Sequence, residues 1–186
     1  MPMENLFINA CVRGTDSRTL VIAIDILKDI EGTTTELVLD SIDLQPLTST
    51  TLALRENLIK SGDFENSMFD YAKQFASADT IIIAAPYWDL AFPALLKVYL
   101  ENICVSGITF RYDNGRPIGL CKAKKLIYIT TAGGPIFADF GYNYIKTMFN
   151  ALRGITDTMC YKAENLDVCN ISVNEVLTKA TITRVE

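Results

Sequence analysis

Histidine is absent from this chain of 186 residues. Its absence excludes Ser-His-Asp and Cys-His catalysis, general base catalysis by histidine and most catalytic metal sites, because each of these needs an imidazole. The five cysteines include no CxxC pair, and their odd number argues against a disulfide framework and a zinc site. A GxGxxG motif is also missing, which excludes the Rossmann dinucleotide fingerprint. We therefore expect no metal site.

Long apolar runs and long basic runs are missing as well. No stretch reaches the roughly 20 apolar residues of a membrane-spanning helix, and the start "MPMENLFINAC" lacks the basic region of a signal peptide. The net charge of −5 argues against a nucleic-acid partner. We expect a cytoplasmic protein without a membrane partner. Its length and its apolar fraction of 49% indicate one domain, residues 1–186.

What the sequence does contain is an alternation of short apolar runs and helical patterns. Buried strands are predicted at residues 5–10, 35–39, 80–85, 125–130 and 156–161. Helices are predicted at residues 17–30, 52–60, 68–76, from 92 onward, 142–153 and 173–180, with a hairpin at 108–120 around Asn114-Gly115. This alternation predicts a five-stranded parallel sheet, order 2-1-3-4-5, with helices on both faces. Ligands of such sheets bind at the carboxyl ends of the strands, where the strand order reverses.

The segment after the first strand, "INACVRGTDSRT" (residues 8–19), is dense in groups that bind anions. A loop that opens a helix offers unpaired N–H groups and the positive end of the helix dipole. Arg13 and Arg18 add charge, while Ser17 and Thr19 add hydroxyl donors. These features favour a phosphate site. An ordinary helix cap flanked by solvated arginines remains the alternative.

The segments after the third and fourth strands are unusual in other ways. "APYWDLAFP" (residues 85–93) holds two aromatic residues between two prolines, and "TTAGGPI" (residues 130–136) removes side chains at a strand end. Taken singly, the first could merely cover the core and the second could be a tight turn. Together with the phosphate loop they describe a site with a phosphate end, an aromatic wall and a bare glycine edge. Those are the features of a flavin mononucleotide (FMN) site.

Nearly the whole chain resembles the flavodoxin-like FMN-dependent NAD(P)H oxidoreductases, specifically the quinone reductase and azoreductase branch. The resemblance lies in the three segments above and in "GITFRY" (residues 107–112), which fits the G-x-T-F-x-Y stretch of that family. It implies a three-layer flavodoxin-like fold and a bound FMN. It also implies hydride transfer from NAD(P)H through the flavin to a small acceptor such as a quinone or an azo compound. The family is homodimeric, so we expect a homodimer.

The resemblance also implies roles for individual residues. The FMN phosphate would be held by Ser17, Arg18 and Thr19, with Arg13 nearby. One side of the isoalloxazine would be lined by Pro86, Tyr87, Trp88 and Asp89. The pyrimidine edge would meet Thr131, Ala132, Gly133 and Gly134. The hairpin near Phe110 and Tyr112 would help to cover the flavin. No side chain is expected to be catalytic, since the cofactor carries the chemistry. Asp89 replaces the usual asparagine, and Ala132 stands where some azoreductases have arginine, which bears on substrate identity.

Three other functions compete with this one. A low-molecular-weight phosphatase or arsenate reductase would use Cys11 as a nucleophile, activated at a helix N-terminus beside an arginine. Its loop has five residues between Cys and Arg, whereas six separate Cys11 from Arg18, and no Asp-Pro segment is present. An electron-carrier flavodoxin is the second alternative, although it would gain nothing from a hairpin that covers a substrate. The third is an interaction protein that keeps the fold and uses flavin only as a sensor.

Overall fold

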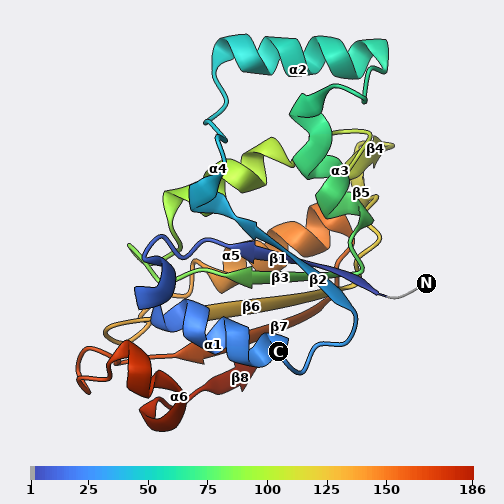
Figure 1. Ribbon diagram of the computed structural model, residues 1–186. Helices are drawn as coiled ribbons and strands as arrows, with labels where there is room; N and C mark the ends of the chain where they lie inside the picture. Colours follow the sequence, from blue (N-terminus) through green and yellow to red (C-terminus); the bar gives the residue numbers. More distant parts are fainter. Residues whose placement is uncertain (1–2) are drawn as a thin grey trace.

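The computed structural model describes residues 3–186, and a six-stranded sheet forms its centre (Figure 1). Five parallel strands lie in the order β2-β1-β3-β6-β7, which is the predicted 2-1-3-4-5 order. Their bounds are Glu4–Asn9 (β1), Thr33–Val38 (β2), Thr80–Ala84 (β3), Lys125–Thr131 (β6) and Asp157–Ala163 (β7). The sheet is therefore mostly parallel, as an alternating sequence requires.

A sixth strand corrects the predicted five-stranded sheet. β8, Thr183–Val185, pairs antiparallel with β7 at the edge of the sheet. Its three residues are all exposed, so they carry neither the apolar run nor the alternation that marks a buried strand. Pairing with β7 makes this segment a strand, and local sequence gives no sign of it.

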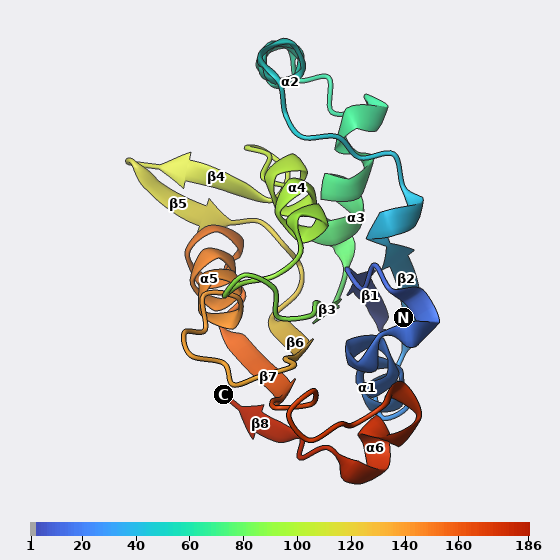
Figure 2. The ribbon, with the colours of Figure 1, turned by 90° about the vertical axis from the view of Figure 1, so that its left-hand side faces the viewer.

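Helices cover both faces of the sheet (Figure 2). One face carries α1, Arg18–Leu27, and the short α6, Val176–Lys179. The opposite face carries α3, α4 and α5, which span Asp70–Ser77, Ala94–Asn102 and Tyr142–Met148. The predicted helix at 142–153 is present as α5 followed by a π-helical segment, Phe149–Arg153, that ends at Gly154. A helix is also predicted at 173–180, and there a 3-10 turn precedes α6.

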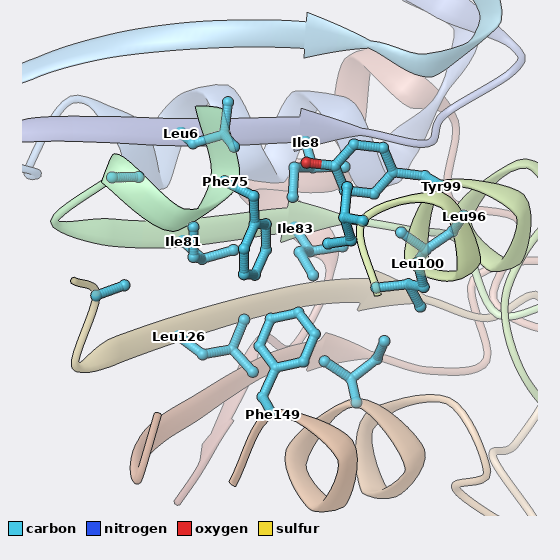
Figure 3. Packing of buried hydrophobic residues seen from close by; sticks show 14 of the residues in the cluster. Leu6, Ile8, Phe75, Ile81, Ile83, Leu96, Tyr99, Leu100, Leu126 and Phe149 are labelled. Atoms are coloured by element: carbon cyan, nitrogen blue, oxygen red, sulfur yellow. The ribbon is translucent and has the colours of Figure 1, made fainter. Parts of the chain in front are cut away.

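The core follows the two-residue period of the strands. Figure 3 shows side chains of β1, β3 and β6 on the face of α3, α4 and α5, namely Leu6, Ile8, Ile81, Ile83 and Leu126. Phe75 of α3 and Phe149 meet there edge to face, with ring centroids 5.4 Å apart. The alternate residues Phe7, Ile82 and Ile127 pack on the side of α1. Both faces of these strands are thus buried, which explains why their sequences are continuously apolar.

Two elements project from the three layers (Figures 1 and 2). Helix α2, Ser49–Ser61, buries none of its residues fully and is capped by a reciprocal pair of hydrogen bonds between Thr48 and Thr51. The predicted hairpin consists of β4, Phe110–Asp113, and β5, Arg116–Gly119, joined at Asn114-Gly115. None of the helices within residues 3–186 has the length and apolar character needed to cross a membrane.

Candidate functional site

A cleft opens at the carboxyl ends of β1, β3 and β6, on the side where the strand order reverses between β1 and β3. This is the position expected for a ligand site in an open parallel sheet. Loops from different parts of the chain line it: Arg13, Asp16, Ser17, Arg18, Thr19, Pro86, Tyr87, Trp88, Thr131, Gly133 and Asp167. The structure therefore brings together the three segments that the sequence singles out, and adds a fourth from the loop after β7.

The first segment presents a capped helix terminus to the cleft. A 3-10 turn, Gly14–Asp16, leads into α1, and the Ser17 hydroxyl caps that helix by accepting a hydrogen bond from the Leu20 N–H at 3.3 Å. The N–H groups of Arg18 and Thr19, the first residues of α1, have no acceptor within the helix. Free donors, hydroxyls and two arginines thus surround a terminus where the helix dipole favours an anion.

Two buried threonines join the first segment to the end of β6. The hydroxyl oxygens of Thr19 and Thr131 lie 2.6 Å apart and form a hydrogen bond. Both residues are buried, so water competes little for this bond. Since Thr19 belongs to α1 and Thr131 to β6, the bond fixes the N-terminus of α1 relative to the glycine-rich edge of the cleft.

The aromatic segment after β3 is held by backbone and side-chain bonds. The Tyr87 N–H donates to the Thr131 carbonyl at 2.9 Å, and the Tyr87 hydroxyl donates to the Ala138 carbonyl at 2.9 Å. Trp88 then begins a tight turn in which Asp89 and Leu90 both have left-handed backbone angles, with φ of 48° and 68°. Such angles are unfavourable for leucine and cluster at functional sites. The turn leaves the Trp88 ring at the mouth of the cleft.

Asp167, in the loop after β7, is a cleft residue that the sequence interpretation missed. Its carboxylate forms an ion pair with Arg18 Nη2 at 2.6 Å, and its N–H donates to the Gly133 carbonyl at 2.9 Å. A Cβ atom at position 133 would overlap that carboxylate. The missing side chain of Gly133 therefore makes room for Asp167. The rule that ligands bind at strand carboxyl ends applies equally to the loop after β7, and this was the available signal.

Not every predicted residue reaches the cleft. The predicted residues that line it are Arg13, Ser17, Arg18, Thr19, Pro86, Tyr87, Trp88, Thr131 and Gly133. Asp89, Ala132 and Gly134 lie outside the lining, and Ala132 is buried behind it. Ala132 instead contributes backbone hydrogen bonds: its N–H donates to the Ala163 carbonyl, and its own carbonyl accepts from the Leu166 N–H. These bonds hold the loop that carries Asp167.

Cys11 has the environment of a packing residue. It is buried, it does not line the cleft, and its Sγ lies 3.6 Å from the Ala84 carbonyl oxygen. Burial raises the pKa of the Cys11 thiol to about 11. A phosphatase nucleophile needs the opposite shift, because the thiolate is the reactive form. The geometry and the pKa thus both argue against attack by Cys11 on a phosphate.

The hairpin lies at the amino-terminal end of the sheet, away from the cleft of its own chain (Figure 1). Phe110 is buried and packs edge to face against Tyr112, with ring centroids 5.5 Å apart, while Tyr112 is exposed. Within one chain neither ring covers the cleft. Residues 3–186 also contain no group of three or more His, Cys, Asp or Glu residues that could hold a metal ion.

Comparison with known proteins identifies the family to which this fold belongs. A family model described as the flavodoxin-like fold matches residues 3–181. The chain belongs to this flavodoxin-like family. The solved structures of an azoreductase from Bacillus anthracis and of an FMN-dependent NADH-azoreductase from the same species, the latter in complex with FMN, are similar in fold. Each gives a TM-score of 0.74, at 21% and 23% identity, over 95% and 94% of this chain and 93% and 92% of theirs.

Curated relatives of this flavodoxin-like chain are closer in sequence. It is 41% identical over 132 residues to FMN-dependent NADH:quinone oxidoreductase 2 of Clostridium acetobutylicum, across 67% of this chain. It is 43% identical over 113 residues to FMN-dependent NADH:quinone oxidoreductase of Clostridium perfringens, across 59% of this chain. The matched parts span 66% and 57% of the lengths of these two relatives.

Proposed function

We propose that this protein is an FMN-dependent oxidoreductase that passes a hydride from NAD(P)H through the flavin to a small acceptor such as a quinone or an azo compound. The observation that carries the proposal is the hydrogen bond between Thr19 and Thr131, because it locks an anion-binding helix terminus to a glycine-rich strand end in one cleft. The names of the relatives support the same chemistry.

The residues of the cleft fit FMN by the chemistry of their donors. Hydroxyl, guanidinium and free N–H donors suit the phosphate, and they come from Arg13, Ser17, Arg18 and Thr19. The flat ring system would lie against Pro86, Tyr87 and Trp88 of the aromatic segment, and its pyrimidine edge would meet Thr131 and Gly133 at the end of β6. Asp89, Ala132 and Gly134 flank these residues outside the lining. The bound FMN would supply the redox chemistry, as it accepts and donates hydride.

The protein itself then has to bind, orient and shield. The Tyr87 hydroxyl, bonded to Ala138, holds the aromatic segment against the loop that follows β6. The Thr19–Thr131 bond sets the spacing between the phosphate end and the ring end of the cleft. Neither role requires a proton-transferring side chain, which agrees with a sequence without histidine. We therefore assign no catalytic residue.

We further propose a homodimer whose interface borders the cleft. Phe137 and Phe140 are 84% and 62% exposed, and both lie in the loop between β6 and α5 that holds Tyr87. Trp88 and Leu90, on the aromatic segment that Tyr87 ties to this loop, are also exposed, and Trp88 lines the cleft. Several exposed large apolar side chains on two such linked segments are typical of a surface that a partner covers. Light scattering should give twice the chain mass of 20.7 kDa.

An anaerobic assay tests the redox function. We expect NADH or NADPH to reduce the bound FMN once in the absence of an acceptor, and to be oxidised continuously only when a quinone or an azo dye is added. One quinone should be reduced per nicotinamide oxidised, and two nicotinamides should be consumed for each azo bond that is cleaved to two amines. An electron-carrier flavodoxin would not oxidise the nicotinamide by itself, so a flavin that stays oxidised in the presence of excess NADH and NADPH contradicts the proposal.

A cytoplasmic location and a single domain over residues 1–186 stay predictions.

A further inference from the structure

Arg18 is already occupied within the cleft. Its Nη2 donates to the Asp167 carboxylate at 2.6 Å, and its Nη1 donates to the Ile171 carbonyl at 3.0 Å. Both terminal nitrogens of the guanidinium are thus engaged by one loop, the segment after β7. This loop contributes to the same cleft as the helix terminus that would receive the FMN phosphate.

The charges that line the cleft cancel. Arg13 and Arg18 are offset by Asp16 and Asp167, so the lining offers a phosphate no net positive charge. The two acids differ in their contacts, however. Asp167 is paired with Arg18, whereas Asp16 forms no ion pair within residues 3–186. A phosphate that approaches Arg18 therefore meets the Asp167 carboxylate, which already accepts a hydrogen bond from Arg18 Nη2.

We infer that Asp167 competes with the phosphate of the flavin for Arg18, so that Asp167 sets how strongly the protein discriminates FMN from riboflavin. The inference rests on the proposed function. A phosphate oxygen needs the same guanidinium donors that Asp167 accepts from, and the carboxylate repels the dianion. Where the phosphate takes the Nη2 donor that Asp167 now accepts, binding of FMN weakens the Arg18–Asp167 pair, and the free energy lost from that pair is subtracted from the affinity.

Removal of the Asp167 charge should leave the rest of the site in place. The Asp167 N–H donates to the Gly133 carbonyl, so the loop is anchored without the side chain. Arg18 keeps its bond to Ile171, and its side chain is only 19% exposed, against 71% for Asp167. Asp167→Asn preserves the shape of the side chain and removes its charge. It is therefore the cleanest substitution for the test.

The experiment measures the dissociation constants of FMN and riboflavin by flavin fluorescence, at one ionic strength, for the wild type and for Asp167→Asn. The two ligands differ only in the phosphate. We expect Asp167→Asn to bind FMN about two- to fivefold more tightly, the range that corresponds to an exposed ion pair, and to bind riboflavin as the wild type does. Asp16→Asn is the matched control, since it removes an unpaired carboxylate from the same cleft and should change FMN binding less.

A second background isolates the part played by Arg18. In Arg18→Met, the further change Asp167→Asn should alter FMN affinity less than it does in the wild type, because only the solvent-screened repulsion between carboxylate and phosphate is left to remove. Unchanged or weaker FMN binding by Asp167→Asn overturns the inference, and so does an equal effect of Asp16→Asn or an equal effect on riboflavin. A wild-type protein that binds no flavin overturns the proposed function and this inference with it. If the wild type binds FMN and Asp167→Asn does not change the affinity as expected, only the inference on Asp167 is overturned, and the proposed function stands.

Discussion

Two arginines of this protein lie in opposite surroundings. Arg18 stands at the edge of the cleft, paired with the exposed Asp167. Arg153 ends the π-helical segment after α5 and is fully buried. Its Nη1 donates to the Thr109 hydroxyl at 3.0 Å, and its guanidinium lies 5.6 Å from the centre of the Phe75 ring. Its Nε and Nη2 have no hydrogen-bond partner among residues 3–186.

The difference shows which guanidinium can change partners and which is fixed by packing. A guanidinium near solvent exchanges partners at low cost, because water replaces a lost contact. A buried guanidinium without a carboxylate cannot do so, and its place in the fold depends on the contacts of its stem and its one hydrogen bond. Arg18 can therefore serve a ligand, whereas Arg153 joins the base of the hairpin at Thr109 to the end of α5.

The largest effect should follow from truncation of Arg153. We expect Arg153→Ala to lower the free energy of unfolding by about 3 kcal/mol, because it leaves a cavity in the core. Arg153→Met should cost much less, since it keeps the volume and removes a charge that has no counter-ion. Urea denaturation measures both. If the Met variant were as unstable as the Ala variant, the charge itself would be the stabilising group.

Truncation of Arg18 should have the complementary effect. We expect Arg18→Ala to weaken FMN binding about tenfold, because a charged donor to the phosphate is lost. The free energy of unfolding should change by less than about 1 kcal/mol, the value of an exposed ion pair. Flavin titration and urea denaturation of the same preparation check both numbers. A large loss of stability would place Arg18 with Arg153 as a packing residue.

A methyl group at Gly133 tests the ion pair between Arg18 and Asp167. We expect Gly133→Ala to lower stability by about 1 kcal/mol, because the new Cβ displaces the Asp167 carboxylate from Arg18. In an Asp167→Ala background, the same change should cost clearly less. Equal losses in both backgrounds, measured by thermal denaturation, would show that Asp167 is not the group in the way.

The smallest effect is expected at Cys11. We expect Cys11→Ser to leave NAD(P)H oxidation unchanged, because Cys11 is buried outside the cleft lining. Its raised pKa, about 11, keeps the thiol protonated at neutral pH, so the wild-type rate should show no ionisation of this group below about pH 9. A pH–rate profile of both proteins checks this. Loss of activity in the serine variant would indicate that Cys11 takes part in the reaction.

Most of the fold is encoded locally and is predictable. Apolar runs identify the five parallel strands, and the Asn114-Gly115 turn identifies the hairpin. β8 is different, since Thr183–Val185 becomes a strand only by pairing with β7. The place of Arg153 is equally nonlocal, because its backbone packs against Gly119, where a Cβ would overlap it, and its side chain bonds to Thr109. Long-range contacts of this kind leave no pattern in a short window of sequence.

The candidate site divides in the same way. Arg18 and Thr19 are evident from a loop dense in donors, and Trp88 from an aromatic segment between prolines. Asp167 carries no local motif, and its place beside Arg18 depends on the way that the loop after β7 folds over Gly133. Sequence therefore predicts which segments meet, whereas the pairing of charges between them needs the structure.

The most direct test of the central claim is the stoichiometry of FMN binding. Purified protein would be mixed with excess FMN, separated from free ligand by gel filtration, denatured, and its released flavin measured against the protein concentration. We predict one FMN for each chain, and weaker retention of riboflavin, because the phosphate contributes to binding at the terminus of α1. A colourless protein that retains no FMN would contradict the account.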